Sequence, residues 1–124
     1  MLFRSWSEQW GREAAGKLLA DQPDTDAIFC GSDQIARGVA DTLRATGRAI
    51  PGDVALVGFD NWEPMALGAQ PPLTSVDMCL EEVGRVAAGL LLAAIADEPA
   101  RGTRRVPCRL VTRQSSRPGP PPKS

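Results

Sequence analysis

The sequence contains no histidine and no tyrosine among its 124 residues. Their absence excludes histidine-based catalytic triads, histidine metal sites and a tyrosine that acts as a general acid. A glycine-rich phosphate loop and a G-x-S-x-G nucleophile motif are also missing, since Gly31 stands alone after its predicted strand. We therefore expect a protein without a nucleophile of these types, without a metal ion and without a cofactor.

The three cysteines, Cys30, Cys79 and Cys108, lie far apart and form no C-x-x-C pair. An odd number of isolated cysteines is typical of buried, reduced thiols in a cytoplasmic protein. The opening residues lack an apolar signal region, and no hydrophobic run is long enough to cross a membrane. Provided that Met1 is the true start, we expect a soluble cytoplasmic protein with no membrane partner.

Charge is distributed unevenly, although the formal net charge is only -1. The first hundred residues hold seven basic and all fifteen acidic side chains, whereas the remainder holds six arginines, one lysine and no acid. The basic segment has no interleaved aromatic residues, so we interpret it as a solvated extension rather than a phosphate-binding surface. Residues 117–124 read RPGPPPKS, and we expect them to form a disordered, proline-rich tail.

Residues 27–59 carry the pattern strand, helix, strand. Short apolar runs at 27–30 and 54–59 are typical of strands that are buried on both faces. Between them, apolar residues recur at helical spacing up to Gly47, a residue suited to end a helix. A unit of this length has parallel strands and a right-handed crossover. The predicted fold class is therefore α/β, a parallel sheet with flanking helices.

Further helices and weaker strands are predicted on either side of this unit. We expect an amphipathic helix over 7–20 and a longer helix with a wide apolar face over about 80–96. Residues 62–72 hold at most a helical turn, residues 73–78 have strand character, and residues 106–110 alternate like a half-exposed edge strand. The apolar face of the first helix is expected to comprise Trp10, Ala14, Leu18 and Leu19.

Parallel strands end at one edge of a sheet, and α/β proteins bind ligands there. Residues 31–33 and the pair Asp60 and Asn61 should therefore face one crevice, with Trp6 at its rim. A carboxylate at a crevice accepts two hydroxyl hydrogens at once, which suits a sugar or a nucleoside diol. Asp60 is the main candidate ligand residue, although a role in a turn or a helix cap explains it equally well.

Three neighbouring residues have simpler explanations beside a ligand role. Ser32 and Asp33 are both suited to cap the following helix, and only the Ser32 hydroxyl is expected to reach the crevice as well. Asp33 is expected as a helix cap or as a support behind the site. Trp6 is suited to stack on the apolar face of a sugar, but a tryptophan at a helix start more often packs against the protein.

Four segments, taken in order, resemble one known family. They are DAIFCGSDQIARGVADTLRATGRAIPGDVALVGFDN, PPLTSVD, EEVGRVAAGLLLAAI and VPCRLVTRQSS. Their order and spacing resemble the carboxyl-terminal half of LacI/GalR-family transcriptional regulators, from about Trp6 to Ser116. The resemblance implies part of a two-lobed sensor of the periplasmic-binding-protein type I fold. Such a sensor binds a sugar or another small effector between its lobes, forms a homodimer and follows a helix-turn-helix headpiece that binds operator DNA.

The resemblance also implies roles for individual residues. Asp60 matches the family's effector-binding aspartate, and Asn61 follows it at the same crevice. Ser32 stands where many members have an effector-contacting asparagine, and its shorter side chain weakens that contact. Trp6 matches an aromatic residue that stacks on the effector in some members. Met78 stands where some members have a polar contact, which is apolar here.

By the same resemblance, part of the family's sensor has no counterpart in the sequence. We expect residues 1–116 to be a partial sensor domain without the headpiece, the first lobe and the family's effector-binding arginine, unable to bind operator DNA by itself. Residues 78–98 would belong to the side of the absent lobe, and we expect this helix to associate or to remain loosely docked. Its exposed apolar positions are predicted to be Leu80, Val83, Leu90 and Leu91.

Three functions of different classes are consistent with the sequence. The leading hypothesis is a non-enzymatic segment for effector binding and dimerisation in a LacI/GalR-type regulator. A second hypothesis is a receptor that delivers sugar to an importer, and the absence of a secretory signal argues against it. A third is an α/β enzyme that uses Asp33 and Asp60 as acid and base, which predicts that turnover is lost in Asp60→Asn.

Overall fold

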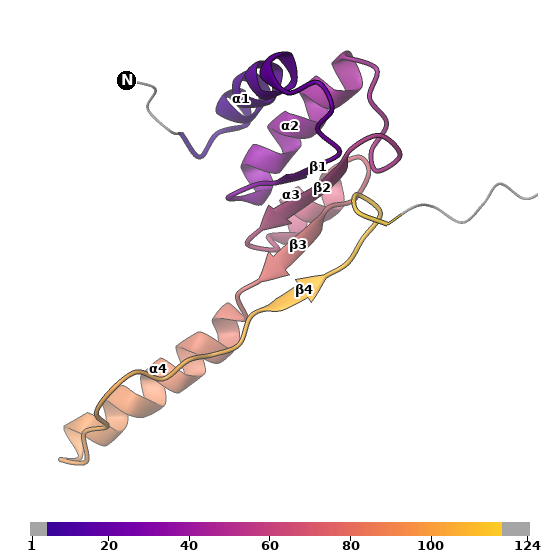
Figure 1. Cartoon of the computed structure of the whole chain (residues 1–124). Coiled ribbons are helices and arrows are strands. Elements are labelled where there is room, and N and C mark those ends of the chain that lie inside the picture. The colour runs from indigo at the N-terminus through magenta and orange to yellow at the C-terminus, as the bar shows by residue number, and fades with distance from the viewer. Residues whose placement is uncertain (1–4, 118–124) are drawn as a thin grey trace, which may run out of the picture.

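The computed structural model describes residues 5–117, and Figure 1 labels the elements of this part of the chain. The first four residues and the predicted tail beyond Arg117 lie outside the described residues. Helices and strands alternate along the chain, as predicted for an α/β fold. They are α1 (Glu8–Asp21), β1 (Ala27–Phe29), α2 (Asp33–Ala45), β2 (Ala55–Phe59), α3 (Glu63–Gly68), β3 (Thr74–Asp77), α4 (Leu80–Ile95) and β4 (Arg109–Val111).

The four strands form one sheet in the order β1-β2-β3-β4. The first three strands are parallel, with Ala27 beside Ala55 and Val57 beside Thr74. The fourth strand runs antiparallel to β3 at the edge of the sheet. The carboxyl ends of β1, β2 and β3 therefore lie along one edge, on the side from which α4 departs (Figure 1). The predicted parallel sheet with flanking helices is confirmed.

The helix α2 forms the centre of the hydrophobic core. It contacts α1, α3 and β2. Its apolar side chains at helical spacing, Ile35, Val39 and Leu43, are all buried, as the sequence predicts. Leu56 of β2 and Val54, which directly precedes this strand, belong to the same core cluster. Both residues are 0% exposed. The crossover between β1 and β2 therefore holds both strand ends in fixed relative positions.

The helices α1 and α2 touch through their backbones at two glycines. A Cβ atom on Gly38 would lie 2.0 Å from the carbonyl oxygen of Glu8, and one on Gly11 would lie 2.3 Å from the carbonyl oxygen of Ile35. Real Cβ atoms do not approach a backbone oxygen so closely, so only glycine allows this contact. The two glycines therefore set how α1 lies on α2.

Because of this contact, α1 buries a different face from the predicted one. The buried residues of the helix are Gly11, Ala15 and Leu19. Glycine has no side chain to mark an apolar face, yet its small size permits the closest packing between helices. Three of the four predicted positions are therefore only half-buried, namely Trp10, Ala14 and Leu18.

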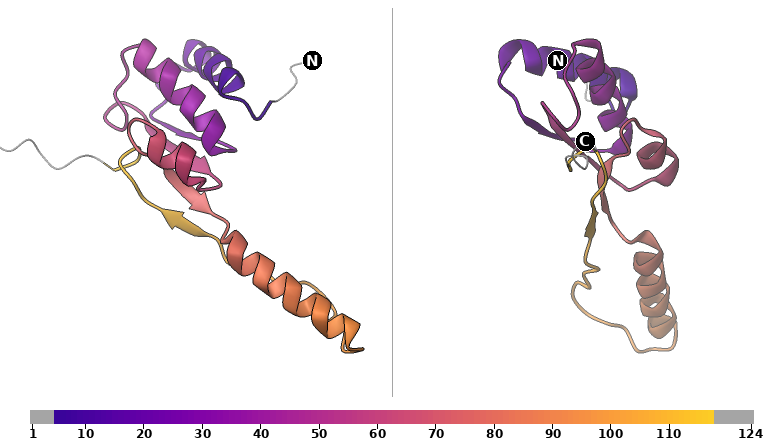
Figure 2. Two further views of the ribbon diagram at one scale, coloured as in Figure 1. Left: turned by 180° about the vertical axis from the view of Figure 1, so that it is seen from behind. Right: turned by 90° about the vertical axis from the view of Figure 1, so that its right-hand side faces the viewer.

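The helix α4 extends away from the rest of the molecule, as both views in Figure 2 show. None of its residues is buried, and Leu80, Val83 and Leu91 are 62%, 40% and 63% exposed. The predicted exposure of its apolar face is confirmed at these positions, whereas Leu90 is half-buried. Within residues 5–117, no helix, including this one, is long and apolar enough to cross a membrane.

Two predictions about smaller features are wrong in part. The last strand covers Arg109–Val111 rather than residues 106–110, because pairing with β3 begins only at the residue opposite Asp77. The cysteines are not uniformly buried, since Cys79 is half-buried and Cys108 is exposed. Only Cys30 fits the prediction, and burial followed by the nearby Asp33 charge raises the pKa of its thiol to about 12.

Candidate functional site

Asp60 follows β2 directly and is exposed at the edge where the parallel strands end. Its amide donates a hydrogen bond to the carbonyl oxygen of Val76 in β3 at 3.0 Å, which extends the pairing of the two strands. The φ angle of Asp60 is 111°, a strained value for a residue with a side chain. The neighbouring strand therefore holds Asp60 in a turn that presents its carboxylate to the outside.

The Asp60 carboxylate is exposed but incompletely solvated. Partial burial, followed by the nearby charge of Asp33, raises the pKa of Asp60 above its usual value. None of the ion pairs found within residues 5–117 involves Asp60. A carboxylate in this situation gains free energy when a ligand donates hydroxyl hydrogens to it.

Ser32 is the N-cap of α2. Its hydroxyl oxygen accepts a hydrogen bond from the amide of Ile35 at 3.1 Å, and only 5% of the residue is exposed. This bond satisfies one of the amides at the start of a helix that lack a partner within the helix. The capping role expected for this position thus belongs to Ser32, and its burial limits any reach into the crevice.

Asp33 supports the site from behind rather than capping the helix, and it is 1% exposed. Its Oδ1 accepts a hydrogen bond from the Ser75 hydroxyl at 2.5 Å, and its Oδ2 accepts one from the amide of Trp62 at 2.9 Å. The carboxylate lies directly on β2, since a Cβ atom on Gly58 would lie 2.2 Å from Oδ1. Asp33 therefore ties α2, β3 and the segment after Asp60 together.

Asn61 bonds within the protein through both ends of its side-chain amide. Its Nδ2 donates to Asp77 Oδ2 at 3.3 Å, and its Oδ1 accepts from Arg113 Nη2 at 2.7 Å. Its backbone amide donates to the Ser75 hydroxyl oxygen at 3.0 Å. These bonds hold Asn61 in the left-handed conformation, with a φ angle of 53°. Asn61 therefore shapes the turn beside Asp60, and these bonds fix the orientation of its side chain.

Trp6 and Met78 flank the site at the ends of β1 and β3. Trp6 is 68% exposed, and its ring lies against Gly31, where a Cβ atom would be 3.2 Å from Cζ3 of the ring. A larger residue at this position would push the ring away. Met78 follows β3 directly and is half-buried. The fold thus brings Trp6, Asp60 and Met78 to the same edge of the sheet.

Sequence reasoning missed the charged residues around the end of β3. Asp77 and Arg109 form an ion pair at 3.0 Å. Arg113 donates to the carbonyl oxygen of Leu73 at 2.7 Å as well as to Asn61. Asp77 has the same sequence signal as Asp60, a carboxylate at the end of a predicted strand. No local sequence pattern predicts the roles of Arg109 and Arg113.

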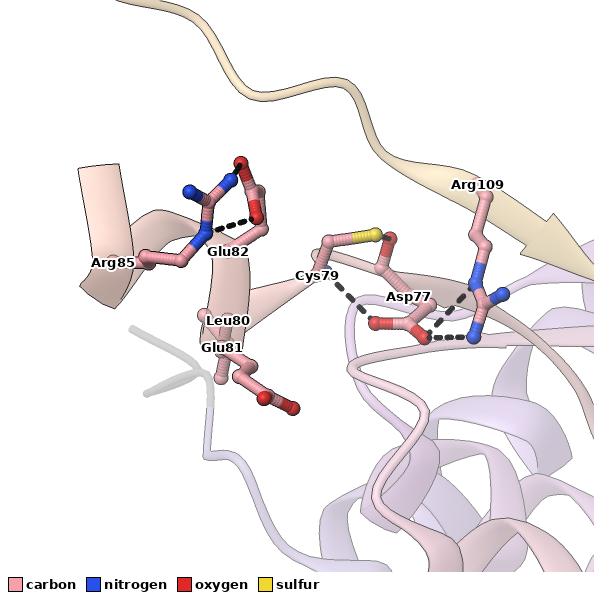
Figure 3. A pocket seen from close by; sticks show the side chains of 7 residues that line it. All are labelled: Asp77, Cys79, Leu80, Glu81, Glu82, Arg85 and Arg109. Carbon is pink, nitrogen blue, oxygen red and sulfur yellow. Dashed lines mark hydrogen bonds and ion pairs between the residues drawn. The ribbon is translucent and has the colours of Figure 1, made fainter.

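A hollow of about 420 Å³ lies between the end of β3 and the start of α4 (Figure 3). Arg109 pairs there with Asp77, and Arg85 pairs with Glu82, so both guanidinium groups already have carboxylate partners. In the part of the chain that the structure describes, no group of three or more potential metal-binding side chains occurs. The edge thus offers acceptors and aromatic surface, which suit a neutral, hydroxyl-rich ligand better than an anion.

Comparison with known proteins identifies the domain family of this chain. A family model described as a periplasmic binding protein-like domain matches residues 3–116. The HTH-type transcriptional regulator CelR of Thermobifida fusca is 41% identical over 106 residues, which are 85% of this chain and 31% of CelR. This chain therefore spans about a third of the length of the curated relatives that it matches.

Solved structures lead to the same group. The complex of the transcriptional regulator CelR with cellobiose has a TM-score of 0.79 and 35% identity, and the match covers 94% of this chain and 38% of that one. The lac repressor dimer bound to operator and an anti-inducer has a TM-score of 0.83 at 24% identity, over 90% and 39% of the two chains, and shares the fold. These relatives are transcriptional regulators rather than enzymes or transport receptors. The chain therefore belongs to the periplasmic binding protein-like domain family, and the predicted resemblance to LacI-family transcriptional regulators is confirmed.

Proposed function

We propose that this chain is the effector-binding and dimerisation segment of a LacI-type regulator, and that Asp60 is the principal acceptor for the hydroxyl groups of a neutral sugar. The observation that carries the proposal is the exposed, incompletely solvated Asp60 carboxylate at the end of β2. Each hydrogen bond to a charged group contributes about 1.5–3 kcal/mol, so two sugar hydroxyls on one carboxylate anchor a ligand well.

The remaining candidate residues have graded roles in this proposal. Trp6 stacks on the apolar face of the sugar ring, because its own ring is largely exposed beside Gly31. Met78 provides an apolar flank. Ser32 and Asn61 contribute little direct contact, because both are already bonded within the protein. A neutral sugar is favoured over a sugar phosphate, since the arginines of the neighbouring hollow are paired.

The proposed sensor needs a second lobe to close over the sugar. Residues 1–116 would form part of the sensor, and residues 78–98 would belong to the side of that second lobe. The exposed apolar face of α4 supports this division, since such a face normally has a partner surface. The relatives also extend far beyond the matched segment, which leaves room in them for a second lobe.

Regulation would follow from a difference in affinity between two arrangements of the sensor. A sugar that binds one arrangement better shifts the population towards it, and only that difference can change binding to operator DNA. Operator DNA would be bound through a headpiece of a homodimer, by analogy with the lac repressor dimer bound to operator. This function places the regulator in the cytoplasm, where it has access to DNA, and assigns it no enzymatic turnover.

The test is a titration of the chain with neutral sugars, in which binding is detected by tryptophan fluorescence. Cellobiose, lactose and ribose form the panel, with glucose 6-phosphate as the anionic comparison. We expect one or more neutral sugars to bind and the phosphate to bind more weakly. Asp60→Ala should raise the Kd of the tightest-binding sugar about tenfold or more, which is the factor for the loss of one hydrogen bond to a charged group.

Asp24→Asn serves as the matched control, because Asp24 is an exposed carboxylate in the loop before β1, away from the edge where the strands end. This substitution should leave the Kd unchanged. Equal affinity of the Asp60→Ala variant and the unmodified chain would contradict the proposal. Chemical conversion of the bound sugar, abolished in Asp60→Asn, would support the enzyme hypothesis instead.

A further inference from the structure

Asp77, the last residue of β3, accepts hydrogen bonds from three different parts of the chain. Its Oδ2 accepts a hydrogen bond from Nη2 of Arg109 in β4 at 3.0 Å and another from Nδ2 of Asn61 at 3.3 Å. Its Oδ1 receives the backbone amide of Cys79 at 2.8 Å. Figure 3 shows the carboxylate of Asp77 between Cys79 and Arg109. A single carboxylate therefore joins the turn after β2, the edge strand and the residue before α4.

Two of these three partners have unusual backbone conformations. Asn61 and Cys79 each have a φ angle of 53°, in the left-handed region that residues with side chains rarely occupy. Such conformations persist only where the surroundings hold them, and Asp77 bonds to both residues. One of the two follows Asp60 directly, and the other is the last residue before α4 begins at Leu80.

The turn after β2 is also fixed from its other side. The amide of Asn61 donates to the Ser75 hydroxyl oxygen at 3.0 Å, and that hydroxyl donates to the buried Asp33 at 2.5 Å. Buried Asp33 makes this second anchor rigid, since it sits against the backbone of β2 at Gly58. Arg113 also bonds to Asn61 Oδ1, and Asp77, with 20% of its side chain exposed, is the partner of Asn61 that bonds to the residue before α4 as well.

We infer that Asp77 is a positioning residue that couples the turn carrying Asp60 to the direction in which α4 leaves the sheet. Its contacts link the conformations of Asn61 and Cys79 through one carboxylate. A ligand that draws Asp60 into a new position then changes the start of α4, and a change at α4 alters affinity at Asp60 by the same factor. The ligand part of this inference rests on the proposed function of Asp60, whereas the coupling itself does not.

The first test removes the carboxylate and follows the amide of Cys79 in the full chain. In Asp77→Ala, the hydrogen exchange rate of this amide should rise about tenfold or more, the factor for loss of one hydrogen bond to a charged group. Asp77→Asn keeps an oxygen acceptor for the amide but loses the ionic contact with Arg109. Its exchange rate should therefore rise less than in the alanine variant.

The decisive variant is Arg109→Gln, because Arg109 lies on β4 and bonds to Asp77 rather than to Asn61. Arg113 of the same segment bonds directly to Asn61 Oδ1, so an effect of this substitution on the side-chain amide signal of Asn61 in NMR spectra is assigned to Asp77 where the signals of Arg113 stay in place. Arg85→Gln is the matched control, since Arg85 lines the same hollow but pairs with Glu82. We expect Arg109→Gln to shift the signals of Asn61 and Asp60 and the control to leave them in place.

Unmoved Asn61 and Asp60 signals in Arg109→Gln, or equal movement in the control, would overturn the inference. Titration with cellobiose separates its two parts. Signals that move in Arg109→Gln, together with an unchanged sugar Kd in Asp60→Ala, would support the coupling and refute the effector role of Asp60. A sugar Kd that depends on Asp60 but not on Arg109 would support that role and refute the coupling.

Discussion

Two regions of the molecule, the sheet packed with α1 and α2 and the extended helix α4, contain similar apolar side chains. In the first region these side chains are buried, and in the second they are exposed. Leu43 of α2 is 0% exposed, whereas Leu91 of α4 is 63% exposed. Both lie on apolar helix faces of the kind that the sequence predicts. The difference teaches that a periodic pattern identifies a face that needs a partner, while the partner itself comes from elsewhere in the fold.

The largest contrast between the two regions should appear on removing a leucine side chain. Leu43→Ala leaves a cavity in the core and should lower the free energy of unfolding by about 3–5 kcal/mol. Leu91→Ala removes a side chain that touches water and should change it by less than about 0.5 kcal/mol. Urea unfolding followed by circular dichroism measures both, and similar losses would mean that α4 is packed in solution.

A smaller contrast is expected from adding one methyl group to a helical glycine. Gly38→Ala places a Cβ atom 2.0 Å from a backbone oxygen of α1 and should cost about 1–3 kcal/mol through overpacking. Gly89→Ala meets nothing within 4 Å and should increase the helicity of α4, since alanine favours a helix by about 1 kcal/mol over glycine. In thermal unfolding, we expect the Tm to fall in Gly38→Ala and to rise in Gly89→Ala. A lower Tm in both variants would argue against an unpacked α4.

The smallest effects concern the two carboxylates and their dependence on pH. The pKa of Asp60 is raised in the folded protein, so its contribution to stability is present below the ordinary pKa of 3.8 and is lost as pH rises through the raised value. The pKa of Asp77 is lowered, first by the Cys79 amide and then by Arg109. Its contribution is present above 3.8 and is lost as pH falls through the lowered value.

These opposite signs give a simple stability measurement at pH 7. Asp60→Asn should raise the Tm slightly, because it removes an incompletely solvated charge. Asp77→Asn should lower the Tm slightly, because it weakens the bonds to Cys79 and Arg109. Both differences should shrink near pH 3. A lower Tm in Asp60→Asn at neutral pH would mean that the protein itself stabilises this charge.

The position of Asp60 could be predicted because its signals are local. An apolar run that ends in a carboxylate identifies both the buried strand and the exposed group that follows it. The turn chemistry around Ser32 was equally local, since a helix cap bonds to an amide three residues later. The α/β fold class followed from the order of such segments.

The network around Asp77 could not be predicted because its partners are far apart in the sequence. Asp77 bonds to residues 16 and 32 positions away, and Asn61 bonds to Arg113 at a separation of 52. The left-handed conformations of Asn61 and Cys79 depend on these bonds. The glycine contact between α1 and α2 was missed for a related reason, because a residue without a side chain leaves no mark on an apolar pattern.

The most direct test of sugar binding at Asp60 is an NMR titration of the full chain with the tightest neutral sugar of the panel. The backbone amide of Asp60 and the indole signal of Trp6 should shift together and saturate at one sugar concentration, while the amides of α4 beyond its first turn remain unchanged. Shifts confined to α4, or to the apolar hollow beside Trp10 and Leu18, with Asp60 and Trp6 unmoved, would contradict the proposed site.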